Sequence, residues 1–295
     1  MKILLIGASG QLGGDLLRNN PGHEIDAPGR DVADLERIDA VVHRIVDHRP
    51  DVVINCAAFH NVPACEIEGE RAFRVNCLAV RDLARASART GARFVTFSTD
   101  YVFGGERDGA YAEEDRPGPL QIYGITRLAG ECAALAEAPS GALVIRTCGL
   151  YGRSGAQSKG GNFVDKRIAE ARATPRMDMA CDQVVVPTST DDLSHAVFAL
   201  LAHPDAGAGV YHLVNEGACT WHAFTAAIFE ILGWPVQVTP VDRGGRSGDM
   251  RRPRNSVLAN TRARALGIVL PHWRDALAAY LRGKYAGDFR TGAAG

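Results

Sequence analysis

The chain begins with Met1-Lys-Ile-Leu-Leu-Ile-Gly-Ala-Ser-Gly-Gln-Leu-Gly13, an apolar run that leads into glycines spaced three residues apart. An amphipathic segment from Leu12 to Arg18 follows directly. This context gives the pattern its meaning, because a strand, a Gly-x-x-Gly-x-x-Gly turn and a helix together lay the pyrophosphate of a dinucleotide on the N-terminus of the helix. The sequence therefore predicts a nicotinamide or flavin nucleotide site that includes Gly7, Ser9, Gly10, Gln11, Leu12 and Gly13.

Each glycine of this turn has a separate mechanical task. Gly7 allows a tight turn after the strand, Gly10 lets the backbone approach phosphate oxygens, and Gly13 lets the helix pack close to the sheet. Free N–H groups and the helix dipole then hold the anion. A glycine-rich turn without a ligand is the alternative, and the strand that precedes the turn argues against it.

Size and composition exclude several other classes of protein. The chain has 295 residues, 46% of them hydrophobic and 23% charged, which suits one large globular domain or two unequal ones. The 33 basic and 34 acidic residues nearly cancel, so net charge favours neither nucleic acid nor a membrane as a partner. No apolar run approaches the roughly 18 residues of a membrane span, and we expect a cytoplasmic protein. The seven cysteines never stand in Cys-x-x-Cys spacing, so we expect reduced thiols, no disulfide framework and no metal site.

Strand-like and helix-like segments alternate over the first half of the chain. Strands are expected near 2–6, 24–27, 51–56, 92–98 and 142–147, and helices near 12–19, 34–48, 67–89 and 121–137. This alternation is typical of an α/β protein with a doubly wound, parallel Rossmann-type sheet. Ligands of such sheets bind beyond the carboxyl ends of the strands.

The second half of the chain is more intermittent. We expect loops at 104–119, 152–162 and 242–256, an amphipathic segment at 163–173, a helix at 191–202 capped by Thr190, a strand at 210–214, and helices at 220–232 and 273–282. Such material predicts a smaller C-terminal substrate lobe without a second independent sheet. The expected division is a NAD(P)-binding Rossmann domain over 1–150 with later returns near 183–214, a substrate lobe mainly over 151–283, and a flexible tail over 284–295.

Three side chains able to reduce a carbonyl stand near two strand ends. Thr99 follows the strand expected near 92–98, and Tyr123 and Arg127 are four residues apart on an expected helix, which places them on one face. A tyrosine donates a proton well when a nearby cation lowers its pKa and a hydroxyl group polarises the same carbonyl oxygen. Each of these residues alone is commonplace on a helix or in a turn. Their combination with the glycine turn predicts a nicotinamide-dependent reductase.

Four motifs occur together: Gly7-x-x-Gly-x-x-Gly13, Asn55-Cys-Ala-Ala58, Ser98-Thr-Asp-Tyr-Val-Phe103 and Tyr123-Gly-Ile-Thr-Arg-Leu-Ala-Gly-Glu131. With them the chain resembles the extended short-chain dehydrogenase/reductases, and among these the dTDP-4-dehydrorhamnose reductase family. The stretches Arg252-Pro-Arg-Asn-Ser-Val-Leu258 and Leu270-Pro-His-Trp-Arg-Asp-Ala-Leu277 are similar to the closing segments of that family. The resemblance therefore covers nearly the whole chain.

The resemblance implies an enzyme that reduces the 4-keto group of a dTDP-linked 4-keto-6-deoxy sugar, with NADPH or NADH as the hydride donor. It implies that Tyr123 is the proton donor and Thr99 its hydroxyl partner, with Arg127 as the third catalytic residue. The cofactor cleft would also include Asn55, Ala57, Ala58, Tyr123 and Arg127. The substrate would contact Asp100, Tyr101, Val102, Asn162, Phe163, Trp221 and Arg252.

Two positions depart from the family pattern. Arg127 stands where the family carries a lysine that lowers the tyrosine pKa and bonds the nicotinamide ribose. Arginine keeps the charge, but its planar fork is longer. In the loop after Asn55, Pro63 replaces a common aspartate, and His60 is a candidate for contact with the sugar or a surface histidine beside a turn. These departures leave open two functions: a reductase of altered specificity, and a non-catalytic NADP-binding regulatory subunit of another enzyme.

Cofactor choice depends on the end of the second strand. A carboxylate there bonds the ribose 2′-hydroxyl of NAD, whereas an arginine accommodates the 2′-phosphate of NADP. Asp26 lies near the acidic position, but we expect the strand to continue to about Arg30. The prediction is therefore NADP(H), with NAD(H) as the alternative.

Two charged clusters need separate interpretation. One cluster consists of five arginines in the loop expected at 242–256, namely Arg243, Arg246, Arg251, Arg252 and Arg254. They suit the diphosphate of a nucleotide sugar, or they form a solvated loop. Nucleic acid is a poor fit, because the loop has no aromatic residue for stacking. Asp191 and Asp192 are explained by the first turn of a helix without a metal. We therefore expect a small-molecule nucleotide-sugar partner, no nucleic acid and no membrane, with the oligomeric state open, a homodimer included.

Overall fold

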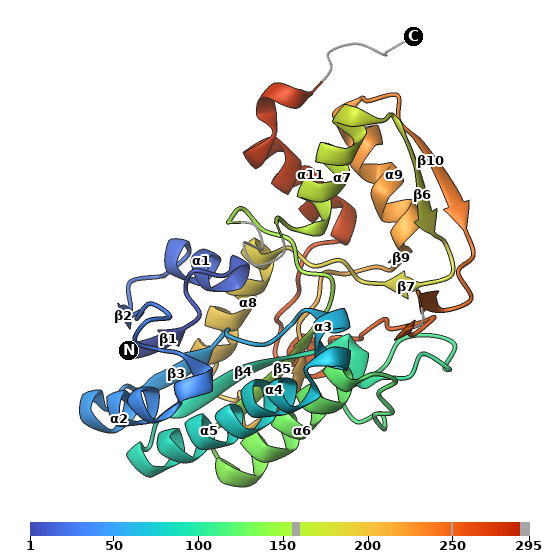
Figure 1. Ribbon diagram of the computed structural model, residues 1–295. Coiled ribbons are helices and arrows are strands. Elements are labelled where there is room, and N and C mark those ends of the chain that lie inside the picture. The colour runs from blue at the N-terminus through green and yellow to red at the C-terminus, as the bar shows by residue number, and fades with distance from the viewer. Residues whose placement is uncertain (155–159, 249, 290–295) are drawn as a thin grey trace.

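The central element of the protein is a six-stranded parallel sheet (Figure 1). The computed structural model describes residues 1–154, 160–248 and 250–289 of the chain. The strands of the sheet stand in the order β2-β1-β3-β4-β5-β8. They are β1 (Lys2–Ile6), β2 (Glu24–Asp26), β3 (Val52–Asn55), β4 (Arg93–Thr99), β5 (Ala142–Thr147) and β8 (Gly209–His212). The strand order reverses at β1, which places the crevice for a ligand beside that strand. The predicted doubly wound fold is confirmed.

Helices cover both faces of this sheet. One face carries α1 (Gln11–Arg18) and α8 (Thr190–Ala202), and the other carries α2 (Asp39–His48), α5 (Ala79–Thr90) and α6 (Ile122–Glu137). The alternation of side chains along β1 shows why: Ile3 and Leu5 belong to the core under α1 and α8, and Leu4 and Ile6 to the core under α2 and α5. A strand buried on both faces needs the continuous apolar run with which the chain begins.

The helix expected at 67–89 is divided into several pieces. It comprises α3 (Val62–Ile67), α4 (Gly69–Phe73), a π-helical turn (Arg74–Leu78) and α5. Within the π turn, the buried Asn76 accepts a hydrogen bond from Phe59 N and donates to Phe59 O and to Thr126 Oγ1. The irregular turn therefore fixes the loop after β3 against α6, a use that periodicity in the sequence does not reveal.

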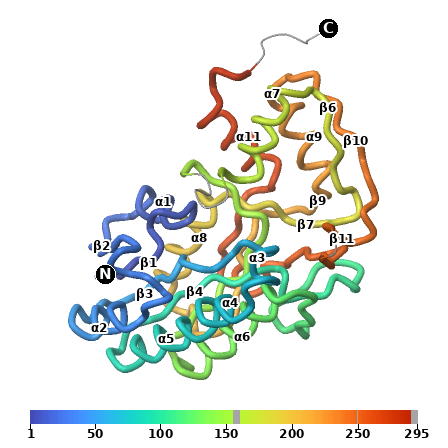
Figure 2. The backbone as a smooth tube through the Cα atoms, in the orientation of Figure 1, coloured from blue at the N-terminus to red at the C-terminus, as the bar shows by residue number. Residues whose placement is uncertain are grey.

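A smaller lobe packs above the carboxyl ends of the central strands. It contains α7 (Phe163–Ala173), β6 (Arg176–Ala180), α9 (Trp221–Leu232), β10 (Gln237–Val241) and α11 (Trp273–Lys284). Short pairs β7 (Val184–Val185) with β9 (Cys219–Thr220) and β11 (Arg246–Ser247) with β12 (Met250–Arg251), and the helix α10 (Thr261–Ala265), complete the second half. Figure 2 shows the chain passing repeatedly between sheet and lobe, so that the lobe is built from several separate segments.

The expectation that the lobe has no sheet of its own was wrong. β6 and β10 form a parallel pair with five residue pairs, from Arg176 opposite Gln237 to Ala180 opposite Val241. The two strands are far apart in the sequence, and each is short. Their pairing depends on the packing of α7 and α9 behind them, which local periodicity cannot predict.

Three other boundaries differ from the expectations. Ser189, rather than Thr190, caps α8, because the Ser189 side chain accepts from Asp192 N. β2 ends at Asp26 instead of near Arg30. At the other end of the chain, α11 continues to Lys284, and the residues at 284–289 are packed against the lobe instead of forming a tail. The rest of the expected tail, 290–295, lies outside the described residues, where the structure offers no test.

Neither a membrane span nor a metal cluster is found within the described ranges. No helix there is both long and apolar enough to cross a bilayer. The same residues contain no group of three or more histidine, cysteine, aspartate or glutamate side chains placed to hold a metal ion. Asp191 accepts hydrogen bonds from Arg18 and Asn19.

Candidate active site

A cleft of about 720 Å³ lies beyond the carboxyl ends of the central strands. Its walls come from the turn after β1, the ends of β4 and β5, the beginning of α6 and the beginning of α7. The predicted residues that line it are Ser9, Gly10, Gln11, Leu12, Gly13, Arg30, Ala58, Thr99, Asp100, Tyr101, Tyr123, Arg127, Asn162, Phe163, Trp221 and Arg252. The structure thus gathers into one cavity residues that are dispersed over most of the sequence.

The glycine turn has the geometry of an anion site. Gly7 has a φ of +83°, and Gly10 N donates to Gly7 O at 3.0 Å. A Cβ on Gly13 would lie 2.3 Å from Gly7 O, so α1 can pack this close only with glycine there. Gly10 supplies no side-chain cap, and the first turn of α1 contains no acidic residue. The first N–H groups of α1 are therefore available to an anion in the cleft.

Tyr123 stands beside Thr99 at the centre of the cleft. Its phenol is within hydrogen-bonding reach of the Thr99 side chain, and its ring lies edge-on to Tyr101, with 6.1 Å between centroids. Burial raises the pKa of Tyr123, while the charge of Arg127 and the hydrogen bond with Thr99 oppose that rise. The lowering by Arg127 that the sequence predicts is therefore present, but burial outweighs it and the net direction is upward.

Arg127 is a buried cation whose guanidinium is only partly bonded by the described residues. Its exposed fraction is 6%, and neither Nε nor Nη1 has a hydrogen-bond partner within the described part of the chain. Leaving charged N–H groups buried and unbonded is costly. A ligand with acceptor oxygens in the cleft would remove that cost, so this guanidinium indicates where a polar part of a ligand lies.

Thr99 is held by its neighbour Asp100. The Thr99 hydroxyl donates to Asp100 Oδ1 at 2.9 Å and accepts from Tyr101 N at 3.2 Å. Asp100 also accepts from Cys148 Sγ at 3.0 Å, and burial raises the pKa of this carboxyl group. The Thr99 hydroxyl is thus held by its own turn at a position within reach of Tyr123.

Tyr101 and Val102 follow in the same turn but have different positions. Arg252 Nη1 donates to the Tyr101 hydroxyl, and its guanidinium lies 5.5 Å from the centre of the Tyr101 ring. Burial raises the pKa of Tyr101 to about 12, although Arg252 opposes the rise. Val102 is fully buried in a hydrophobic cluster with Phe103 and is not part of the cleft lining, so its prediction as a substrate contact was wrong. Alternation within the turn points Val102 into the core.

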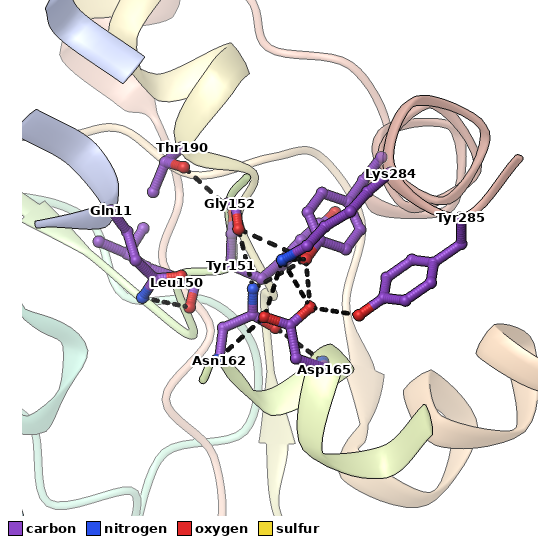
Figure 3. A network of polar contacts seen from close by, with 10 residues as sticks. Gln11, Leu150, Tyr151, Gly152, Asn162, Asp165, Thr190, Lys284 and Tyr285 are labelled. Atoms are coloured by element: carbon purple, nitrogen blue, oxygen red, sulfur yellow. Dashed lines mark hydrogen bonds and ion pairs between the residues drawn. The ribbon is translucent and has the colours of Figure 1, made fainter. Parts of the chain in front are cut away.

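Asn162 has a structural task that the sequence does not show. Its side chain caps α7 by accepting from Asp165 N at 2.9 Å, and its amide donates to Gly152 O and to Tyr280 Oη, both at 2.9 Å. Figure 3 shows this amide within a network that also joins Asp165 to Lys284 and Tyr285. Both amide N–H groups are thus used inside the protein, and Asn162 is better described as positioning α7 than as a substrate ligand.

The lobe contributes an aromatic pair and two cations to the cleft. The rings of Phe163 and Trp221 lie 4.6 Å apart between centroids, and both line the cavity. Lys166, one turn further along α7, lines it as well and is exposed. Among the five arginines of the loop at 242–256, Arg252 reaches the described cleft lining and the other four do not. The expectation of a five-arginine diphosphate site therefore reduces to one arginine.

Three residues predicted for the cofactor cleft lie behind its lining. Gly7, Asn55 and Ala57 support the turn: Asn55 Oδ1 accepts from Ala57 N at 3.1 Å, and a Cβ on Gly7 would lie 2.8 Å from Ala57 N. Asn55 is 2% exposed, so its prediction as a direct contact was wrong. Close packing of two loops, which a sequence motif does not distinguish from ligand contact, is the physical reason.

The end of β2 presents a different arrangement from the one expected. Asp26 accepts two hydrogen bonds from Arg44, at 2.6 and 2.7 Å from its two carboxylate oxygens, and these bonds lower the pKa of Asp26. Arg30 lines the cleft with a side chain that is 73% exposed. The acidic side chain is therefore engaged by α2, while the basic one lines the cavity and also donates to Glu36 at 3.3 Å.

Several cleft residues were missed at the level of sequence. They lie at strand ends and on α7: Cys56, His60, Val62, Phe97, Ser98, Thr147, Cys148, Gly149, Leu150, Gly161 and Lys166, although His60 had been considered as a sugar contact. The stretch from Thr147 to Leu150 follows β5, and the rule that ligands lie at the carboxyl ends of parallel strands could have found it. Lys166 could have been found only from its place one turn after Asn162.

Comparison with known proteins agrees with this geometry. The RmlD substrate binding domain family matches residues 1–285. The spore coat polysaccharide biosynthesis protein SpsK of Bacillus subtilis is 35% identical over 283 residues, which cover 95% of this chain and 97% of SpsK. A dTDP-4-dehydrorhamnose reductase of Streptomyces griseus is 39% identical over 281 residues, covering 93% of this chain and 91% of that one.

A solved structure shows the same architecture. The dTDP-4-dehydrorhamnose reductase of Bacillus anthracis, crystallised in complex with NADP, superimposes with a TM-score of 0.89 at 31% identity, covering 96% of this chain and 99% of that one. The match extends over both the sheet and the lobe, and the resemblance inferred from the motifs is confirmed. The chain belongs to the RmlD substrate-binding domain family, whose members include reductases of dTDP-linked keto sugars.

Proposed function

We propose that this protein is an NADPH-dependent reductase of the 4-keto group of a dTDP-linked 4-keto-6-deoxy sugar. The observation that carries the proposal is the meeting of Thr99, Tyr123 and Arg127 in a cleft that begins at the glycine turn of α1. Relatives whose alignments cover more than nine-tenths of the chain, at 39% and 36% identity, are named dTDP-4-dehydrorhamnose reductase. Geometry and relationship thus favour the same reaction class.

The residues present fit a nicotinamide dinucleotide. The uncapped N-terminus of α1 suits a pyrophosphate, and the unbonded Nε and Nη1 groups of Arg127 suit ribose hydroxyls. Arg30 in the cleft, together with an Asp26 carboxylate already bound by Arg44, favours NADPH over NADH. When bound, the cofactor supplies the hydride.

Tyr123 supplies the proton in this proposal. The Thr99 side chain lies within hydrogen-bonding reach of the phenol, and Asp100 holds Thr99 in turn. The positive charge of Arg127 stabilises the phenolate that remains after the proton has moved to the carbonyl oxygen. Burial of Thr99 and Arg127, each 6% exposed, strengthens these electrostatic effects.

The lobe would hold the nucleotide part of the substrate. Phe163 and Trp221 form an aromatic pair able to contact a planar base. Arg252 and Lys166 are the lining cations that suit a diphosphate, with Arg252 also fixed against Tyr101. The sugar would then lie between Tyr101 and Tyr123, near the loop that carries His60.

The test is the loss of reduced-cofactor absorbance when the protein is incubated with NADPH and a panel of dTDP-4-keto sugars. Tyr123→Phe should lower kcat at least about 100-fold and leave the NADPH dissociation constant within about twofold, because the phenolic proton is lost and the ring is kept. Thr99→Ala should lower kcat in the same way. A parent protein that binds NADPH but oxidises it with none of these sugars would exclude the reductase.

One observation favours a second function, a non-catalytic NADP-binding regulatory subunit. Arg127 replaces the lysine of the family motif, and the pKa of Tyr123 is raised. Arg127→Lys separates the two functions. Increased or equal turnover in the variant supports the reductase, whereas parent and variant that are both inert, folded and able to bind NADPH support the subunit.

A further inference from the structure

Glu131 occupies a critical place on α6. It follows Arg127 by four residues and Tyr123 by eight, so the three side chains share one face of the helix. Glu131 is 3% exposed and Arg127 is 6% exposed. A buried carboxylate one turn from a buried guanidinium is expected to pair with it, because each charge is costly to bury alone.

The carboxylate is instead bound by an arginine from the sheet. Arg146 of β5 donates from Nε to Glu131 Oε1 at 3.0 Å and from Nη2 to Oε2 at 2.7 Å, a two-pronged contact that engages both oxygens. Its Nη1 donates to Glu113 O at 3.3 Å and lies 3.4 Å from His212 Nε2. Arg146 is therefore anchored on the side of Glu131 that faces the sheet.

We propose that Arg146 is a positioning residue that withholds Glu131 from Arg127. While Arg146 binds the carboxylate, the Arg127 guanidinium keeps N–H groups without a partner in the described structure and stays available to the cofactor. Without Arg146, Glu131 would turn to the nearest cation on its own helix face and neutralise it. The inference rests on the proposed role of Arg127 in holding the cofactor ribose.

The experiment compares the NADPH dissociation constants, measured by nucleotide fluorescence, of four variants. Arg146→Gln should weaken NADPH binding about tenfold or more, because it frees Glu131 to bond Arg127. Arg146→Lys keeps a cation for Glu131 and should stay within about threefold of the parent. Arg146→Gln with Glu131→Gln removes both charges and should restore binding to within about threefold. Glu131→Gln alone should lower thermal stability but leave binding unchanged.

A merely structural role for the ion pair would give a different pattern. In that case NADPH affinity would decrease in proportion to the loss of stability in each variant, and the double variant would not recover binding. A folded Arg146→Gln protein with parental affinity would also overturn the proposal. If Arg146→Gln does not fold, Glu131→Gln decides: unchanged affinity supports the proposal, and markedly tighter binding would show that Glu131 already engages Arg127 and would overturn it.

Arg127→Met distinguishes failure of this inference from failure of the proposed function. If Arg127→Met binds NADPH as tightly as the parent, the assumed role of Arg127 is wrong and the inference falls with it. If Arg127→Met binds weakly while Arg146→Gln binds normally, the role of Arg127 stands and the withholding of Glu131 is refuted. Weak binding by both, with recovery in the double variant, supports both.

Discussion

Replacement of Asp165 by alanine tests how the lobe is fastened to the cleft. Asp165 lies in the first turn of α7 and accepts from Tyr280 Oη and Tyr285 Oη, both at 2.7 Å, and from Lys284 Nζ at 2.9 Å (Figure 3). These donors come from the end of α11 and the residue after it. One carboxylate therefore joins the C-terminal helix to the helix whose first residue, Phe163, lines the cleft.

The magnitude follows from the number of charge-assisted bonds. A hydrogen bond to a charged group contributes about 1.5–3 kcal/mol, and the three donors share one carboxylate, so the contributions are not additive. The side chains of Asp165 and Lys284 are only 17% and 26% exposed, which limits screening by solvent. We expect Asp165→Ala to lower the free energy of unfolding by about 3 kcal/mol, or the melting temperature by about 6 °C.

The dependence on pH has a defined sign. Burial raises the pKa of Asp165, but the hydrogen bonds from Tyr280, Lys284 and Tyr285 outweigh it, and the pKa lies below its usual value. The stabilisation is therefore complete above the unfolded pKa of about 3.9 and is lost as pH falls through the lower folded value. The stability difference between parent and variant should be constant near neutral pH and should narrow below about pH 4.

Chemical unfolding at several pH values, together with steady-state kinetics, measures these effects. Looser placement of Phe163 should raise KM for the nucleotide sugar, while the NADPH dissociation constant stays within about twofold. Glu170→Ala is the matched control, since this exposed acid on α7 pairs with Arg167 at the surface and should change stability by less than about 0.5 kcal/mol. A loss in Asp165→Ala no larger than in the control, or a difference that does not narrow as the pH falls below about 4, would refute the reasoning.

Two further predictions concern the glycine turn and a buried histidine. Gly13→Ala should weaken NADPH binding about tenfold or more, because its Cβ would lie 2.3 Å from Gly7 O. Gly14→Ala is the control and should bind NADPH nearly normally, because its Cβ meets only the movable side chain of Ser154. Titration of nucleotide fluorescence measures both dissociation constants, and equal values would contradict the packing argument. Burial and the charge of Arg146 lower the pKa of His212 to about 3. Between about pH 3 and the unfolded pKa near 6.5, the unfolded chain holds one more proton than the folded chain, so the free energy of unfolding decreases as the pH is lowered. His212→Gln should reduce that slope by about 1.4 kcal/mol per pH unit, as seen in unfolding curves; an unchanged slope would assign the acid sensitivity to other groups.

Local patterns in the chain were sufficient to predict the architecture of the half that carries most of the central sheet. The apolar run before Gly7 and the spacing of the three glycines predicted β1, the turn and α1. A strand buried on both faces needs consecutive apolar residues, and a turn of positive φ needs glycine. Thr99, Tyr123 and Arg127 were likewise predicted together, since a strand end and an i, i+4 spacing are readable in one dimension. The proposed reaction class, a nicotinamide-dependent reduction, follows from this combination.

Contacts between distant segments became visible only in three dimensions. The amide of Asn162 is used by Tyr280, the carboxylate of Asp26 by Arg44, and Glu131 by Arg146, and each of these partners is remote in the sequence or on another element. Hydrogen-bonding groups have a limited number of partners, so whether a side chain is free for a ligand depends on what the folded chain has already brought beside it. A motif specifies which chemistry a residue offers, while packing decides whether that chemistry faces the cleft.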